Sequence, residues 1–199
     1  MGSDHVRVLV LAPVLEQPSE CSRKRSAHEY ALSGELGAAW AVRAVALGRW
    51  RGRTVLVLED PGGEPLDVVL RRPLELRQTL RLAIGVAGAL AKVHAAGLIH
   101  KDVKPANLLV EPASGQAWLM GFGIASRLPQ ERQPAESPRE VFAGTLAYMA
   151  PEQTGRMNRS IDSRSDLYAF GVTLYEMLTG VLPFTAGDAM EWVHCHVAR

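Results

Sequence analysis

The sequence predicts an α+β fold, in which short strands and long helices occupy different parts of the chain. Apolar residues recur at three- and four-residue spacing over residues 76–93, which is typical of one face of a helix. A second strongly apolar helix is expected to begin near Asp166 and to stop before Gly180. Its buried side is expected to consist of Leu167, Phe170, Leu174, Tyr175 and Leu178. Short apolar runs bounded by turn residues predict strands at residues 6–12, 55–58, 108–110 and 117–120.

The first sixty residues are expected to hold a strand, a helix and a second strand. After strand 6–12, a connection containing Pro and Ser leads to a helix over residues 23–36. Strand 55–58 then runs into the turn-forming residues 59–63. The apolar run 8–15 is too short to span a bilayer and is interrupted by proline, so a buried strand explains it better than a membrane segment or a signal.

Residues 99–110 organise the rest of the chain, because they hold polar functional groups on a loop between a helix and a strand. Gly97 is well placed as the left-handed cap of that helix, and Pro105 stiffens the loop. Asp102 can accept or orient the proton of an attacking hydroxyl, and Lys104 can neutralise charge on a transferring phosphoryl group. Asn107 offers a neutral oxygen to a hard cation. The helix face that precedes them is expected to consist of Leu76, Leu80, Ile84, Ala87, Leu90 and Val93.

This loop and several motifs in the same order resemble a eukaryotic-type serine/threonine protein kinase. Residues 152–160 and 190–196 are also similar to one bacterial subfamily, in which a kinase-like domain precedes an ATPase module and a sensor histidine kinase. The other matching motifs are Met120-Gly121-Phe122-Gly123, Gly144-Thr145-Leu146-Ala147-Tyr148, Ala150-Pro151-Glu152 and Asp166-Leu167-Tyr168-Ala169-Phe170-Gly171.

The resemblance implies a two-lobed protein kinase-like fold, with residues 1–199 as a single partial domain. Residues 1–60 would be an incomplete small lobe of strands and one helix, with a hinge near residues 59–63. Residues 64–199 would be a mostly helical large lobe, truncated before its final helices. The glycine-rich phosphate loop should precede strand 6–12, where Gly2 is the only glycine.

The resemblance also implies ATP and Mg²⁺ as cofactors and transfer of the γ-phosphoryl group to a protein serine or threonine. Asp102 and Lys104 would then be catalytic, and Asn107 would hold magnesium and the nucleotide. Glu59 would lie in the hinge that binds adenine through its backbone. Glu29 matches the helix glutamate that pairs with a strand lysine and the phosphates.

Three departures from the family pattern predict a pseudokinase: the missing glycine-rich phosphate loop, and the residues at positions 121 and 10. Gly121 stands where an aspartate holds the principal magnesium, and glycine has no ligand atom. Val10 stands at the position of the strand lysine, so Glu29 lacks its expected partner. The hinge N–H donor falls at Pro61 or Gly62, and a proline has no N–H. An active kinase, if missing segments are supplied, and a non-functional gene fragment remain the alternatives.

Composition restricts the class of partner. The net charge of +1 comes from 22 basic and 21 acidic residues, so nothing favours nucleic acid or an anionic membrane. A protein substrate or partner signalling domains are expected instead, in the cytoplasm, where Cys21 and Cys195 would stay reduced. His194 and His196 flank Cys195 and suggest metal ligands, but adjacent helical residues point about 100° apart and cannot converge.

Ser137 and Thr145 are either phosphorylation sites or simply solvated hydroxyls.

Overall fold

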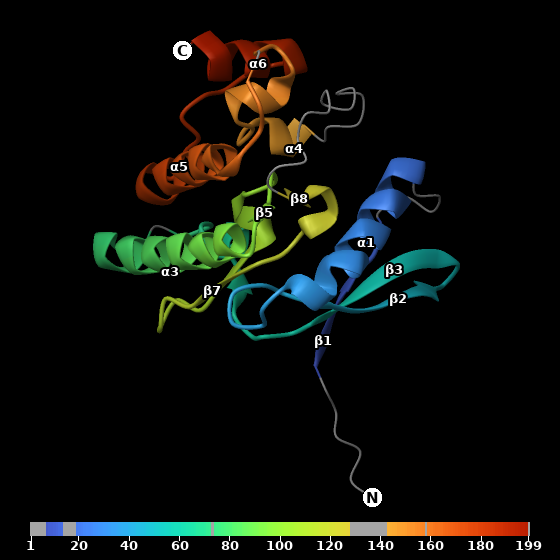
Figure 1. Ribbon diagram of the computed structural model, residues 1–199. Coiled ribbons are helices and arrows are strands. Elements are labelled where there is room, and N and C mark those ends of the chain that lie inside the picture. The colour runs from blue at the N-terminus through green and yellow to red at the C-terminus, as the bar shows by residue number, and fades with distance from the viewer. Residues whose placement is uncertain (1–6, 14–18, 73, 128–142, 158, 199) are drawn as a thin grey trace, which may run out of the picture.

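The structure is a computed structural model, and it describes residues 7–13, 19–72, 74–127, 143–157 and 159–198. These residues form a small antiparallel sheet with a helix beside it, and a larger, mainly helical region (Figure 1). The predicted α+β class and the two-lobed arrangement are therefore confirmed. Ser137 lies outside the described residues.

The small sheet contains β1 (Val8–Leu11), β2 (Ala44–Trp50) and β3 (Arg53–Glu59) in the order β1-β3-β2, with antiparallel pairing throughout. Strands β1 and β3 were predicted, whereas β2 was missed. The expectation that β1 is buried is wrong, because Val8, Val10 and Leu11 are 45%, 52% and 38% exposed at the edge of the sheet. Arg51 and Gly52 join β2 to β3, and both have positive φ, at 49° and 78°. Two positive φ values are typical of a two-residue hairpin turn. Arginine is an unusual residue in that conformation, so only Gly52 signalled the turn.

Helix α1 (Glu20–Leu32) packs beside the small sheet, and a 3₁₀ turn, η1 (Ser33–Glu35), continues it. It begins and ends slightly earlier than predicted, because the Ser19 hydroxyl caps its first turn by accepting the Ser22 N–H at 3.1 Å. The buried side chains of the helix are Glu29 and Leu32. Helix α1 therefore presents a carboxylate, rather than a broad apolar face, to the rest of the molecule.

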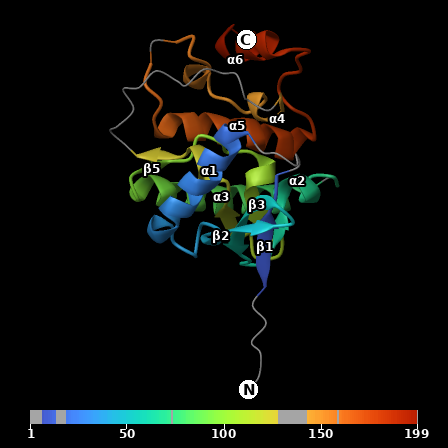
Figure 2. The ribbon, with the colours of Figure 1, turned by 90° about the vertical axis from the view of Figure 1, so that its right-hand side faces the viewer.

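The larger region is organised around helices α3 (Leu76–Ala95) and α5 (Ser163–Thr179), which lie side by side in both ribbon views (Figures 1 and 2). A three-stranded antiparallel sheet joins β4 (Glu64–Pro65), β6 (Leu108–Val110) and β7 (Ala117–Leu119), and β5 (Leu98–Ile99) pairs with β8 (Ser126–Arg127). The remaining elements are α2 (Leu66–Val69), η2 (Pro105–Asn107), η3 (Phe122–Ile124), α4 (Ala143–Leu146), η5 (Pro151–Thr154) and α6 (Ala189–Ala198).

The boundaries of the long helices agree with the sequence-based expectation. Gly97 follows α3 with φ of 73°, and Gly180 caps α5 with φ of 74°. At both positions a side chain would be strained, which is why glycine marks the helix end so reliably. Strands β6 and β7 also form where the apolar runs predicted them.

The predicted face of α3 is buried only at Leu90 and Val93, because Ala87 and the three earlier residues of that face are exposed. Leu76, Leu80 and Ile84 are 63%, 48% and 73% exposed. Four residues turn about 400° around the helix axis, which is about 40° more than a full turn. The two steps from Leu76 to Leu80 and from Leu80 to Ile84 therefore move the predicted face about 80° around the helix. The face that is buried consists of Thr79, Leu82, Ala83, Val86, Ala89, Leu90 and Val93.

The predicted face of α5 is wrong for a different reason. Leu167, Tyr175 and Leu178 were expected to be buried but are 54%, 44% and 50% exposed. The helix instead turns its small and polar side chains inward, because Asp166 on that face bonds to the loop that begins at residue 99. The buried residues of α5 are Ser165, Asp166, Ala169, Val172, Thr173 and Met177.

An apolar cluster connects the small sheet to the larger region near the end of β3. It brings Leu58 of β3 together with Leu109 of β6 and with Met120, and Leu9 of β1 packs against it. Leu109 is 4% exposed and Met120 is 9% exposed. Apolar side chains therefore fill the space between these strands.

Candidate active site

The loop after β5 is held in place by the carboxylate of Asp166, which is completely buried. Its Oδ2 accepts the His100 N–H at 2.9 Å, and its Oδ1 accepts the Lys101 N–H at 2.7 Å. The His94 Nε2 lies 2.8 Å from Oδ2. Lys101 has φ of 69°, a left-handed conformation that costs a non-glycine residue energy. The two bonds to Asp166 offset this cost and fix the loop.

The three predicted residues of the loop come together. The Lys104 ammonium donates to both carboxylate oxygens of Asp102, at 2.9 and 2.8 Å. The Asn107 Nδ2 donates to the Asp102 backbone carbonyl at 2.7 Å and to Oδ2 at 2.8 Å. The 3₁₀ turn η2, which begins at Pro105, places Asn107 in reach of this carboxylate. The arrangement presents an oriented carboxylate beside a positive charge.

Thr145 also belongs to this group, although the sequence suggested either a phosphorylation site or a solvated hydroxyl there. Its Oγ1 accepts a hydrogen bond from the Lys104 ammonium at 2.8 Å. Lys104 therefore bridges Asp102 and the segment that contains Thr145. Sequence proximity gave no signal of this contact, because the two residues are 41 positions apart.

His100 packs rather than taking part in chemistry. Its ring is completely buried and lies edge-on to Phe122, with ring centroids 4.6 Å apart. The Nδ1 accepts the Asp102 N–H at 3.2 Å, so Nε2 carries the proton and donates to the Met120 carbonyl at 3.0 Å. Burial lowers the pKa of His100. The neutral ring therefore supports the loop beneath Asp102.

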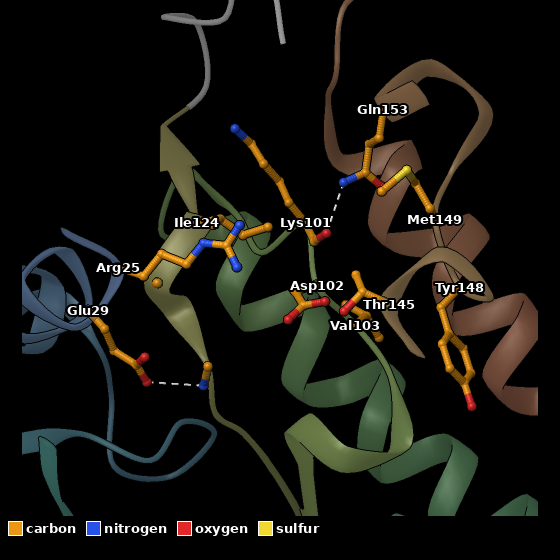
Figure 3. A pocket seen from close by; sticks show the side chains of 12 residues that line it. Arg25, Glu29, Lys101, Asp102, Val103, Ile124, Thr145, Tyr148, Met149 and Gln153 are labelled. Carbon is orange, nitrogen blue, oxygen red and sulfur yellow. Dashed lines mark hydrogen bonds between the residues drawn. The ribbon is translucent and has the colours of Figure 1, made fainter. Parts of the chain in front are cut away.

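Glu29 finds a partner that the sequence did not reveal. Its Oε1 accepts the Gly121 N–H at 3.0 Å (Figure 3), and the Phe122 N–H also bonds to it. Burial raises the pKa of Glu29, although these two N–H groups act in the opposite direction. Val10, at the expected lysine position, is 52% exposed. The carboxylate thus holds the backbone of the Gly121 turn.

The residues present do not fit a resident magnesium ion. Gly121 adopts a left-handed conformation, with φ of 82° and ψ of 44°, and a Cβ atom there would lie 3.0 Å from the Asn107 Cγ. The position therefore faces Asn107 but supplies no oxygen. Within the described part of the chain, no three His, Cys, Asp or Glu side chains gather as metal ligands. One amide oxygen is a poor substitute for the carboxylates that Mg²⁺ prefers.

At the two positions expected to supply the hinge donor, neither residue offers a free N–H group. Pro61 has none, and the Gly62 N–H donates to the Asp60 Oδ1 at 2.9 Å. The side chain of Glu59 is engaged by Arg43, whose Nε and Nη2 donate to it at 2.8 and 2.6 Å. Neither residue can therefore donate to an adenine ring, because Pro61 has no N–H and the N–H of Gly62 is bonded to Asp60.

A cavity of about 200 Å³ lies between α1 and the loop (Figure 3). Arg25 and Glu29 line one side, and Lys101 and Asp102 line the other. Pockets for drug-sized ligands usually measure about 300–1,000 Å³. No sequence motif singled out Arg25, whose side chain points into this space (Figure 3). The cavity is too small to enclose a nucleotide.

Comparison with known proteins agrees with the resemblance seen in the sequence. A model described as the protein kinase domain matches residues 13–199. The serine/threonine-protein kinase pkn3 of Myxococcus xanthus is 36% identical over 154 residues, which cover 74% of this chain and 28% of that protein. PknA of Mycobacterium tuberculosis is 40% identical over 149 residues, covering 73% of this chain and 33% of the relative. The kinase pkn2 of Myxococcus xanthus is 38% identical over 146 residues, or 72% and 17% of the two chains.

The chain thus spans a third or less of the length of these relatives. Among the described residues, no helix has both the length and the apolar content that crossing a bilayer requires.

Proposed function

Because this chain belongs to the protein kinase family, we propose that it is a kinase-fold signalling domain whose phosphoryl-transfer chemistry is severely weakened or lost. The family reaction is transfer of the ATP γ-phosphoryl group to a protein serine or threonine. The proposed domain has a partial small lobe over residues 1–60, a hinge near residues 59–63 and a partial large lobe over residues 64–199. The observation that carries the proposal is Gly121.

Gly121 removes charge where the reaction needs it most. Loss of one preorganised electrostatic group typically lowers a rate by about 100- to 1,000-fold. The strand lysine is missing as well, since Val10 replaces it and Glu29 bonds to backbone N–H groups instead. These effects need not multiply, because such groups act as a unit. Either loss alone makes the chain a poor phosphotransferase.

The hinge and the cavity argue against tight nucleotide binding. The Gly62 N–H is occupied by Asp60, and Pro61 has no N–H to offer the adenine ring. A separate cavity of about 810 Å³ borders Glu59, Asp60 and Pro61, so the missing N–H donor, and not a lack of space, disfavours adenine at the hinge. ATP and Mg²⁺, the cofactors of the family, are therefore expected to bind weakly.

An active serine/threonine kinase is the second candidate, because the loop is intact. In this alternative, Asp102 orients the substrate hydroxyl, Lys104 stabilises charge on the phosphoryl group and Asn107 holds magnesium, with Glu59 and Glu29 at the nucleotide. The bonds that join Lys104 and Asn107 to the Asp102 carboxylate favour this reading. A non-functional fragment is the third alternative.

The partners of the proposed domain are proteins. They are either a protein substrate or the signalling domains of one long polypeptide, with an ATPase module and a sensor histidine kinase. The similarity of residues 152–160 and 190–196 to that subfamily supports this architecture. The balanced net charge of +1 gives no reason to expect nucleic acid. A cytoplasmic location is part of the proposal.

Titration of the protein with ATP, with and without Mg²⁺, during thermal unfolding tests the proposal. A ligand at 100 times its Kd stabilises a protein by about 2.7 kcal/mol. For a domain of this size that corresponds to about 5–11 °C in Tm. We expect a shift below about 1 °C at millimolar ATP. We also expect no radiolabel transfer to serine or threonine acceptors beyond that of an Asp102→Asn control.

A large Mg²⁺-dependent shift together with labelling that requires Asp102 would establish the active-kinase alternative instead. The same unfolding curve tests the third alternative. A soluble monomer that unfolds in one cooperative transition is not a misfolded fragment.

A further inference from the structure

Helix α6 contains a buried histidine that has no role in the site described so far. His196 is 7% exposed, whereas His194, two residues earlier, is exposed. Trp192 stacks on its ring at a centroid distance of 5.9 Å and an angle of 18°. Phe184 and Tyr168 contact the ring edge-on, at 5.5 and 5.7 Å. The ring is thus held on three sides by aromatic side chains.

Both ring nitrogens of His196 are hydrogen-bonded. The Nε2 lies 2.8 Å from the Leu146 carbonyl oxygen, and the Nδ1 lies 2.8 Å from the Tyr168 hydroxyl. A carbonyl can only accept, so Nε2 carries the proton and Nδ1 accepts from Tyr168. Burial lowers the pKa of His196, which favours this neutral form. The tautomer and the orientation of the ring are therefore both determined.

The bond to Leu146 reaches the active-site loop in two further steps. Leu146 is the last residue of the four-residue helix α4 and directly follows Thr145. Thr145 accepts the bond from Lys104, and Lys104 pairs with Asp102. A four-residue helix has little hydrogen bonding of its own, so its position depends on contacts with other elements. His196 supplies one of these contacts from a helix about fifty residues further along the chain.

We infer that His196 is a positioning residue: by holding the Leu146 carbonyl it keeps Thr145 against Lys104 and thereby orients the pair formed with Asp102. The role belongs to the site on which the proposed function rests, but it does not require that site to transfer phosphate. It would serve a catalytic loop in an active kinase and a fixed surface in a pseudokinase. Packing alone does not account for it, because an apolar ring would fill the aromatic cage equally well.

Three single substitutions separate positioning from packing. His196→Phe keeps an aromatic ring and loses both hydrogen bonds. His196→Gln restores an amide that can donate to the Leu146 carbonyl and accept from Tyr168. His194→Gln, on the same helix but exposed, is the matched control. Tyr168→Phe, which removes only the bond that orients the ring, is a milder variant should His196→Phe fail to fold.

Two local measurements on the whole chain test the inference. One is hydrogen–deuterium exchange of the backbone amides in residues 143–149, and the other is the rate at which an acetylating reagent modifies Lys104, followed by mass spectrometry. In His196→Phe we expect both rates to rise about tenfold, as the loss of buried hydrogen bonds implies. We expect a smaller rise in Tyr168→Phe, recovery to within about threefold in His196→Gln and no change in His194→Gln.

Exchange within α3 and α5 serves as the internal reference. The inference is wrong if Lys104 reacts at the original rate in both His196→Phe and Tyr168→Phe. It is also wrong if exchange accelerates equally throughout α3 and α5, or if His196→Gln gives no recovery, since each result indicates general destabilisation. None of these readouts uses ATP, so this outcome and that of the nucleotide titration are independent.

Discussion

The buried carboxylate of Asp166 is expected to contribute strongly to stability, because it accepts two backbone N–H groups of the loop. Asp166→Ala leaves the N–H groups of His100, which is buried, and of Lys101, which is half-buried, without an acceptor. Each unpaired buried donor costs about 1–3 kcal/mol, so the two together lower the free energy of unfolding by about 2–6 kcal/mol. For a domain of this length, Tm should fall by at least about 4 °C.

Urea unfolding followed by circular dichroism and by tryptophan fluorescence measures this loss. Asp162→Ala is the matched control, because Asp162 caps the same helix by accepting the Arg164 N–H at 2.9 Å. Loss of an exposed cap costs about 0.5–2 kcal/mol. Asp166→Asn should fall between the two, since its amide oxygen can accept from one of the two N–H groups. If Asp166→Ala is no more damaging than Asp162→Ala, then the carboxylate does not secure the loop and the reasoning fails.

Two further predictions concern the turn at Gly121. Burial raises the pKa of Glu29, so the native state binds the proton of this carboxyl more tightly than the unfolded chain does. The free energy of unfolding should therefore decrease as pH rises from 4.5 towards the raised pKa. Glu29→Gln should remove that decrease in urea titrations at successive pH values, and an unchanged slope would contradict it. Gly121→Asp places a carboxylate at φ of 82° beside Asn107, which should cost about 1–2 kcal/mol of stability but add a Mg²⁺-dependent thermal shift with ATP. Gly121→Ala carries a comparable backbone strain without the ligand, and equal shifts in both variants would refute the metal argument.

Local chemistry explains why so much of the candidate site was predictable. Asp102, Lys104 and Asn107 lie within six residues, so the turn that begins at Pro105 brings them together whatever surrounds it. The ends of α3 and α5 were predictable for the same reason, because Gly97 and Gly180 need their left-handed conformations irrespective of distant contacts.

Partners that lie far apart in the sequence were not predictable from spacing. The acceptor of the Gly121 N–H is Glu29, 92 residues earlier, and Lys104 reaches Thr145. The buried faces of α3 and α5 were mispredicted for the same reason, because distant parts of the chain determine which face of a helix is covered. Large apolar side chains suggested one face, yet a helix buries whichever side its neighbours cover, and here that side carries Asp166.

The sequence by itself determined the family, the polar loop and the absence of a carboxylate at residue 121, since these depend only on which residues follow one another. Only the tertiary structure decided that Asp60 occupies the Gly62 N–H, that Glu29 bonds to a backbone turn and that His196 reaches Leu146. The physical reason is that hydrogen-bonding groups can be satisfied in many ways in an unfolded chain. Packing selects among them, and no spacing rule encodes that selection.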